Sequence, residues 1–352
     1  RMETDVLWQD YGLDRLESGI SQLFPKTEIS AKELFGQVMS GDVTGALGSL
    51  LKGSVAGVTD QLAGMRNVLI WLLVMGIISA LVAHFVEIFE MHQVADIAFY
   101  FMYLLFMAIL LKCFCEAAAT AVDTLENITL FIRLLVPVYL VSVGVSGGSA
   151  TAGIACQLML FVIYGVECIL SQGIISLIYS YVTLSMVNGI WAEEKLSMLV
   201  ELLKKVIGWA LKGAVGVITG ISIFQALITP VVDSARSSAL QKIVSALPGV
   251  GNLADGAVEL VLGSALVIKN SIGVVLLLLM LVLCAAPLLK IALIAGVLKC
   301  AAAFMGVVSD KRITTCVDRA GEGGLLLLRT TGTAMLLFLI SVAVVTAASG
   351  RI

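Results

Sequence analysis

The residues of this sequence that could do chemistry are ionisable side chains and helix breakers placed inside long apolar runs. They fall in two stretches, 133–148 and 242–270. Each stretch combines Pro or Gly, which interrupt helices, with charged or amide side chains. Inside a membrane, non-helical backbone survives where it is buried in protein or lines a water-filled cavity. The two stretches therefore predict a polar pathway or re-entrant turn, with the candidate residues Arg133, Pro137, Gly147, Gly148, Pro248, Gly249, Gly251, Asp255, Glu259, Lys269 and Asn270.

Three cations lie within or beside the apolar runs: Arg133, Lys269 and Lys290. A charge at the centre of a bilayer costs about 2.5–3.5 kcal/mol on insertion scales, so each cation needs a partner or water. For Arg133 and Lys269 two interpretations stay open, a polar pathway and snorkelling of the long side chain to the membrane surface. In a hairpin, Lys269 would pair with Asp255 or Glu259. Lys290, which lies close to a proline kink, is expected to snorkel.

The remaining reactive side chains do not form the pattern of a metal or catalytic site. Cys113 and Cys115 have C-x-C spacing, but small apolar helix residues are the simpler interpretation. His84 and His92 are not part of an H-E-x-x-H sequence, and no G-x-x-x-x-G-K-[ST] loop occurs. The carboxylates of Glu193–Glu194 have lysines nearby and are interpreted as a solvated loop. We therefore expect no enzyme activity, no cofactor and no metal.

Composition explains the surroundings of these residues. The chain has 352 residues, of which 59% are hydrophobic and 13% charged, and its mean hydropathy is +1.04. Soluble domains contain about 45–50% apolar and about 25% charged residues, so a water-soluble enzyme is nearly ruled out. The net charge of −3 argues against a nucleic-acid binder. Continuous apolar runs argue against a membrane β-barrel. We predict an all-α, polytopic helical membrane protein.

Two regions are expected along the chain. Residues 1–66 form a polar, extracytoplasmic helical region, and residues 67–348 form a transmembrane domain. A run of about 20 apolar residues spans a bilayer. The sequence has eight such runs, at 68–89, 97–115, 128–145, 152–170, 174–190, 206–228, 272–297 and 325–347. A further apolar stretch, 257–268, is too short to span and lies inside the candidate re-entrant segment 242–270.

Lys and Arg in short loops predict the orientation, because cytoplasmic loops carry the excess of positive charge. The loops after the fifth and seventh predicted spans hold Lys195, Lys204 and Lys205, and Lys299, Lys311, Arg312 and Arg319, respectively. Two predicted spans separate these loops, so both are expected on the cytoplasmic side. The N-terminus and the C-terminus then lie outside the cytoplasm. An exported N-terminus needs an upstream signal peptide, and the absence of Met at position 1 fits either its removal or a shortened sequence.

Three blocks of residues resemble a known family. The most distinctive runs from Leu247 to Asp255 and continues to 267–270 and Gly273, and the others are 134–148 and 313–318. The order of parts, an exported N-terminal region followed by a polytopic body, is also similar. On these features the chain resembles the stage III sporulation protein AE family.

The resemblance implies a role in endospore formation, in the mother-cell membrane that surrounds the forespore. Such proteins are similar to components of a secretion-type channel that links mother cell and forespore and permits late forespore gene expression. The implied partners are other membrane and ring-forming proteins of the same complex, an ATPase that supplies energy, and the lipid bilayer, with no nucleic acid. The family has no catalytic motif to carry over.

A second function class stays open. Broken segments in both halves of a chain are also typical of secondary transporters with a midplane site, so the protein could be a stand-alone transporter. A transporter should work alone in liposomes, whereas a channel component should need its partners. An intramembrane enzyme is disfavoured because the required constellations of His, Ser and Asp are missing.

Overall fold

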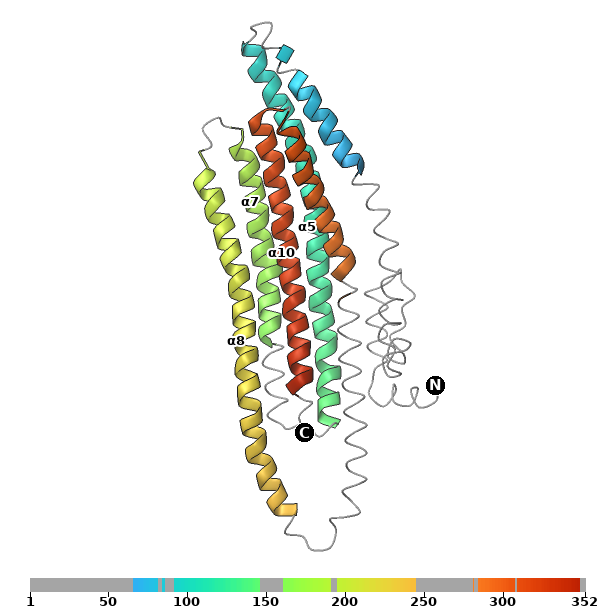
Figure 1. Ribbon diagram of the computed structural model, residues 1–352, viewed down its shortest axis with the longest axis vertical. Helices are drawn as coiled ribbons and strands as arrows, with labels where there is room; N and C mark the ends of the chain where they lie inside the picture. The colour runs from blue at the N-terminus through green and yellow to red at the C-terminus, as the bar shows by residue number, and fades with distance from the viewer. Residues whose placement is uncertain are drawn as a thin grey trace, which may run out of the picture.

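The computed structural model describes residues 66–81, 84–85, 92–145, 161–190, 195–244, 281, 284–307 and 309–348. Within these ranges the chain is almost wholly helical and has no strand. The helices pack lengthwise into one elongated bundle (Figure 1). Among the described helices, four are long and apolar enough to cross a membrane. The all-α class is confirmed, and the four apolar helices support a membrane protein.

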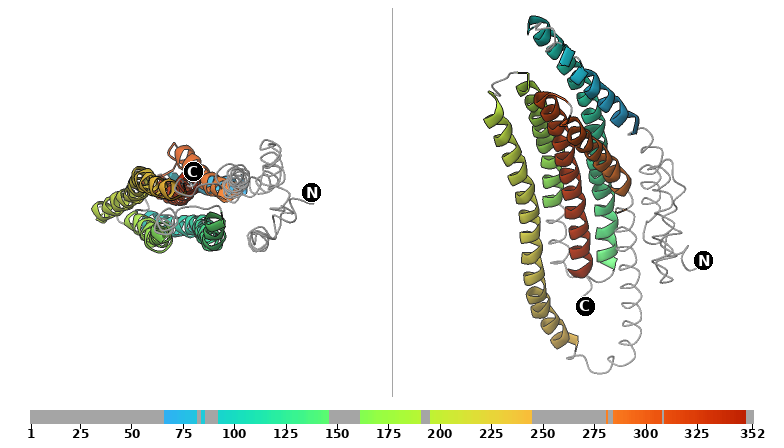
Figure 2. Two further views of the ribbon diagram at one scale, coloured as in Figure 1. Left: turned by 90° about the horizontal axis from the view of Figure 1, so that it is seen from below. Right: turned by 45° about the horizontal axis from the view of Figure 1, so that its top comes forward.

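Six helices make up most of the described ranges. They are the 66–81 helix (Arg66–Leu81), α5 (His92–Val145), the 161–188 helix (Phe161–Asn188) with its π-helical turn η1 (Ile169–Ile174) and its last part α7 (Ile175–Asn188), α8 (Ser197–Val244), the 284–305 helix (Cys284–Met305) and α10 (Lys311–Ala348). α10 contacts α5, α7 and α8, and α7 also contacts α8. Seen from below, the described helices stand side by side in a flattened bundle (Figure 2).

Helix α5 corrects the prediction of two separate spans at 97–115 and 128–145, because it is one continuous helix of 54 residues. The intervening segment, 116–127, carries charges and lies between the two predicted spans. It is rich in Ala, the strongest helix former, and buries Ala117, Ala118 and Ala121 while its carboxylates face outward. The hydroxyl of Thr124 also donates to the carbonyl of Thr120, 2.6 Å away, which hides a polar group within the helix.

The predicted spans 152–170 and 174–190 are likewise not separate in the part that the structure describes. Residues 161–188 form one helix, and residues 152–160 lie outside the described ones. The polar triplet Ser171-Gln172-Gly173, which separates the two predicted spans, lies inside η1. A π turn absorbs one extra residue without ending the helix. The carbonyl of Gln172 accepts a hydrogen bond from the Ser176 hydroxyl at 2.6 Å.

Other predicted spans correspond to parts of observed helices. The span 206–228 lies within α8, 325–347 lies within α10, and 68–89 and 272–297 overlap the 66–81 and 284–305 helices. Most of the N-terminal region and of the re-entrant segment 242–270 lies outside the described residues. The re-entrant segment and the count of eight spans stay predictions.

Two of the helices are much longer than a bilayer is thick. α5 has 54 residues and α8 has 48. At 1.5 Å per residue they are about 80 and about 70 Å long, whereas the hydrocarbon core of a bilayer is about 30 Å thick. Both helices are therefore more than twice as long as the hydrocarbon layer is thick.

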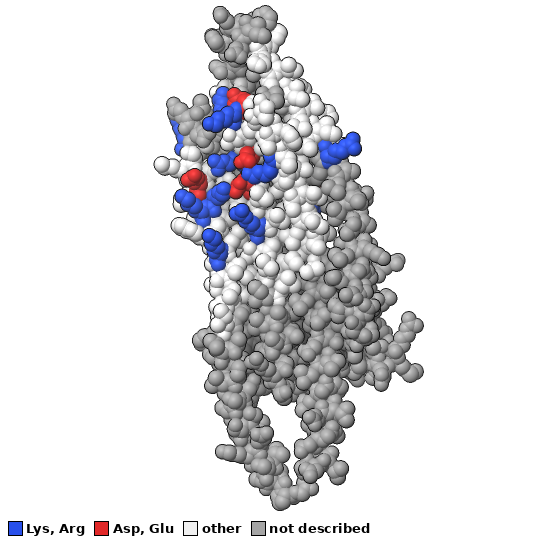
Figure 3. All heavy atoms as spheres, in the orientation of Figure 1, with Lys and Arg blue, Asp and Glu red and all other residues white. Residues whose placement is uncertain are grey.

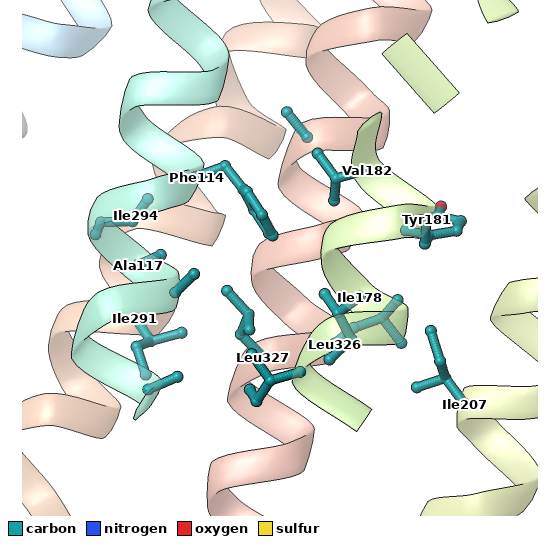
Figure 4. Packing of buried hydrophobic residues seen from close by; sticks show 14 of the residues in the cluster. Phe114, Ala117, Ile178, Tyr181, Val182, Ile207, Ile291, Ile294, Leu326 and Leu327 are labelled. Carbon is teal, nitrogen blue, oxygen red and sulfur yellow. The ribbon is translucent and has the colours of Figure 1, made fainter. Parts of the chain in front are cut away.

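The core of the bundle lies between α10 and its neighbours (Figure 4). Phe114 of α5, Val182 of α7, Leu327 of α10 and Ile291 of the 284–305 helix are almost completely buried in one cluster. Their side chains point toward one another from four elements (Figure 4). Apolar contacts thus hold α10 from three sides.

Small residues of α10 allow the helices to approach closely. A Cβ atom added at Gly323 would overlap the side chain of Val182 and lie 3.2 Å from Cε2 of Phe114. One added at Gly324 would lie 2.9 Å from Cβ of Ala295. Glycine at a helix interface lets two backbones pack at short range, which is a common device among membrane helices.

Candidate functional site

The residues predicted to form a polar pathway are largely outside the described part of the chain. Arg133 and Pro137 lie on α5, and their side chains are not among the described ones. The helix continues through Pro137 to Val145, the last residue of the predicted span 128–145. Neighbouring groups can satisfy the carbonyl that a proline frees in a membrane helix. The other nine candidates, Gly147, Gly148, Pro248, Gly249, Gly251, Asp255, Glu259, Lys269 and Asn270, lie outside the described residues.

Many of the described Lys and Arg residues gather in the upper part of the face shown, near one end of the bundle (Figure 3). We call it the basic end and define it by Lys195, Lys204, Lys205, Lys299, Lys311, Arg312 and Arg319. The turn from α7 to α8 and the turn from the 284–305 helix to α10 both lie here (Figure 1). The two groups of cations thus share one side, as the sequence indicated. They are not loop residues, however: apart from Lys195, all of them lie within helices.

An ion-pair network inside the basic end joins three helices. The two carboxylate oxygens of Glu322 on α10 accept from different lysines. Oε1 lies 2.8 Å from Nζ of Lys204 on α8, and Oε2 lies 3.1 Å from Nζ of Lys299 on the 284–305 helix. Lys299 also donates to Oδ1 of Asp318, one helical turn before Glu322, at 2.7 Å. We call these four residues the Glu322 network. It was not predicted from the sequence.

Glu322 and Lys299 are the partly buried members of the Glu322 network, whereas Lys204 and Asp318 are 41% and 49% exposed. The Glu322 side chain is 17% exposed and that of Lys299 is 29% exposed. Charge-assisted hydrogen bonds between partly buried groups are stronger than exposed ion pairs, which contribute little. The backbone reaches this geometry because Gly321 faces Lys299: a Cβ there would lie 3.1 Å from Cγ of the lysine. The sequence Gly-Glu-Gly-Gly at 321–324 therefore places a carboxylate between close-packed helices.

A second ion pair joins the 284–305 helix to α5. Nζ of Lys290 lies 3.1 Å from Oε1 of Glu116, and the lysine side chain is 25% exposed. Lys290, which was expected to snorkel, thus has a carboxylate partner. This partner was not predicted from the sequence, because Glu116 lies between the predicted spans 97–115 and 128–145.

Three further polar contacts fix the helix ends at the basic end. The hydroxyl of Tyr103 on α5 donates to the carbonyl of Met186 on α7 at 2.6 Å. Oδ1 of Asn188 accepts from the backbone N–H of Leu196 at 2.7 Å, which closes the turn into α8. The guanidinium of Arg312 stacks 3.8 Å from the ring centroid of Phe99, a cation–π contact between α10 and α5.

A small polar pocket lies beside these contacts, between α7, α8 and α10. Ser185 and Asn188 line one wall and Arg312, Thr315 and Arg319 another.

Elsewhere, Cys113 is buried whereas Cys115 is exposed, so the C-x-C pair does not face one site. Among the described residues no group of three His, Cys, Asp or Glu side chains could hold a metal ion.

Comparison with known proteins identifies the family. The model of the family described as stage III sporulation protein AE matches residues 29–349, which is most of the chain. The chain belongs to the stage III sporulation protein AE family. It is 23% identical over 258 residues to stage III sporulation protein AE of Bacillus subtilis (strain 168). That match covers 73% of this chain and 65% of the relative, so the chain spans less than two thirds of the relative's length. No solved structure matches the chain.

The resemblance found in the sequence is thus confirmed, and one of its blocks belongs to the basic end. In this member of the stage III sporulation protein AE family, residues 313–318 form the first turns of α10 and end on Asp318 of the Glu322 network. Of the three blocks that carry the resemblance, it was the one that pointed to a residue of the Glu322 network. Glu322 itself carried no signal, because a carboxylate among glycines is equally typical of a turn.

Proposed function

We propose that this chain is a membrane component of a secretion-type channel complex that links mother cell and forespore during endospore formation. The observation that carries the proposal is the family match over residues 29–349, which implies a role in sporulation. Within that role, the chain would serve as a structural and conduit component, with no chemistry of its own. An ATPase partner would supply the energy.

The shape of the bundle supports an assembly role. Helices about 70–80 Å long leave surface on at least one side of a bilayer that is about 30 Å thick. The Glu322 network and the close contacts of Gly323 and Gly324 hold the long helices in fixed register. A rigid bundle that projects from the membrane suits a component to which other membrane and ring-forming proteins bind.

The orientation follows from the charges. We place the basic end on the mother-cell cytoplasmic side, because cytoplasmic segments carry the excess of Lys and Arg. Residues 1–66 would then lie in the space between the two membranes. Ring-forming partners could reach them there, whereas the ATPase would approach the basic end.

Replacement of the gene in its own spore-forming host tests the role. A strain that lacks the chain should stop before late forespore gene expression, and a tagged copy should restore spore counts. The tagged protein, purified from sporulating membranes, should bring other proteins of the complex with it. Purification as a single species that transports solutes alone in proteoliposomes would instead favour a stand-alone transporter.

Cysteine labelling tests the orientation separately. Lys311 is exposed at the start of α10, and the exposed native residues Cys115 and Cys300 can be replaced by Ala to lower the background. A membrane-impermeant maleimide should reach Lys311→Cys only after the mother-cell membrane is opened. A cysteine at Ser21 should be labelled without opening the mother-cell membrane, once the space between the membranes is accessible. The reverse pattern would refute the orientation.

A further inference from the structure

A buried carboxyl group without a partner lies inside the 161–188 helix. Glu167 has an exposed fraction of 0%, and both of its carboxylate oxygens are buried without a hydrogen-bond partner among the described residues. This contrasts with Glu322, whose two oxygens each accept from a lysine. Glu167 was not predicted as a site from the sequence, because it is a single acidic residue within an apolar run.

Burial without a partner determines the chemical form of this side chain. An ionised carboxylate moved alone into an apolar interior costs far more than a neutral acid does, so such groups take up a proton. Ionisable residues inside membrane helices face the bundle interior and mark sites of function by default. Glu167 follows this pattern, because it faces the interior of the bundle rather than its surface.

Among the described residues, the charged groups of the surrounding helices do not compensate Glu167. α5, α8 and α10 pack against the η1 turn, and their charged residues Glu126, Lys212 and Arg329 are exposed. In the same part of the chain, the thiol of Cys284 interacts electrostatically with the carboxyl and is itself completely buried. Arg133 also lies on α5, but its side chain is not among the described ones, so the experiment below includes it.

The π turn η1 begins two residues after Glu167. A π turn inserts one residue, and one residue corresponds to about 100° of rotation about the helix axis. η1 therefore decides which face of the preceding segment points into the bundle. Such turns are frequent at functional sites, and this one aligns a carboxyl with the apolar core.

We propose that Glu167 is a proton-binding site of the membrane bundle, whose carboxyl is held as the neutral acid while the helices are packed. Its ligand is a proton, and its position next to η1 would allow rotation of that turn to expose the carboxyl for proton exchange. Proton binding here is independent of the channel complex proposed above, because it concerns the isolated chain.

Dicyclohexylcarbodiimide tests the proposal, because this apolar reagent enters membranes and reacts with protonated carboxyl groups. The acid proton passes to a carbodiimide nitrogen, the carboxylate oxygen adds to the central carbon, and the adduct rearranges to a stable N-acylurea. The full chain, reconstituted in phosphatidylglycerol and phosphatidylethanolamine vesicles at pH 7, would be treated, digested and analysed by mass spectrometry. We expect the adduct on Glu167 and its loss in Glu167→Gln.

Glu126 is the matched control, since it is an exposed carboxyl on the neighbouring helix α5. The apolar reagent should label Glu167 in preference to Glu126, and a water-soluble carbodiimide should not label Glu167. Infrared spectra should show a carbonyl band of a protonated acid that disappears in Glu167→Gln. Labelling of Glu126 alone would overturn the proposal. Labelling of Glu167 that appears only after Arg133→Gln would also overturn it, because the carboxylate would then be ionised and paired with Arg133.

Discussion

Removing the charge of Glu322 should destabilise the bundle more than removing that of any exposed carboxylate. The Gln side chain of Glu322→Gln keeps the shape but deprives Lys204 and Lys299 of a carboxylate at 2.8 and 3.1 Å. Lys299 keeps its ion pair with Asp318 at 2.7 Å, so Lys204 is the lysine that is left without a carboxylate partner. A hydrogen bond to a charged group contributes about 1.5–3 kcal/mol when buried. Because the Lys204 side chain is 41% exposed, we reduce the expected loss to about 1–2 kcal/mol.

The chain provides a matched control for this experiment. Glu201 and Lys205 on α8 form an i,i+4 pair at 3.9 Å, with side chains that are 67% and 65% exposed. Such pairs contribute about 0.3–0.5 kcal/mol, so Glu201→Gln should hardly change stability. The mutation removes the same charge at the same end of the molecule. Any difference between the two variants therefore reports the burial and geometry of the Glu322 network.

Thermal unfolding in detergent, followed with a thiol-reactive dye, provides the assay. Cys284 and Cys316 are buried and should react only when the bundle opens. A loss of 1 kcal/mol lowers the unfolding temperature by about 2–4 °C in domains of roughly 150–250 residues, so a decrease of this order is expected for Glu322→Gln. A double-mutant cycle with Lys204→Met should give a coupling energy of about 1 kcal/mol, because Lys204 is the lysine that loses its partner in Glu322→Gln. Equal unfolding temperatures for Glu322→Gln and Glu201→Gln, or zero coupling, would refute the reasoning.

Three other substitutions test the packing and the remaining polar links. Gly323→Ala should destabilise the bundle by about 1–3 kcal/mol, because the added Cβ overlaps a side chain of α7. Gly332→Ala on the same helix is the control: its Cβ meets nothing within 4 Å, so it should be neutral or stabilising in the same unfolding assay. Tyr103→Phe removes the buried hydrogen bond to α7 and leaves a carbonyl without its donor, so it should lower the free energy of unfolding by about 1–3 kcal/mol. Tyr100→Phe, at an exposed position, is the control and should lower it by less than about 0.5 kcal/mol. Lys290→Met should lower the unfolding temperature measurably, since it leaves a carboxylate of α5 unpaired, and an unchanged temperature would support snorkelling instead.

Hydrophobic runs were sufficient to predict the fold class but not the lengths of the helices. The segment 116–127 of α5 has carboxylates at three positions, and a count of apolar residues therefore predicts a gap. Those carboxylates lie on one face, while alanines fill the other face against the core. Counting consecutive apolar residues does not register that polar and apolar residues alternate with the period of a helix. Helix propensity and the 3.6-residue period together favour a continuous helix. The π turn η1 carries no sequence signal, because it is selected by the packing of residues on both sides.

The Glu322 network could not be predicted, because it depends on which helices are neighbours. Lys204, Lys299 and Glu322 come from three helices, and the longest separation between them along the chain exceeds 100 residues. Local sequence shows only that each is charged and near an apolar run. The sequence did predict that the two groups of cations lie together, and the structure places both at one end of the bundle.

The contacts that hold α10 at the basic end differ in kind from those around η1. A slip of α10 by one turn along its axis, about 5.4 Å, would break the ion pairs of Glu322 with both lysines at once. The same slip would drive side chains into the spaces that Gly323 and Gly324 leave open, so charge and shape oppose the same motion. Near η1 the contacts are different: they are apolar, and Glu167 has no hydrogen bond among the described residues that resists rotation. Any conformational change coupled to proton binding should therefore occur around η1, while the basic end keeps its register.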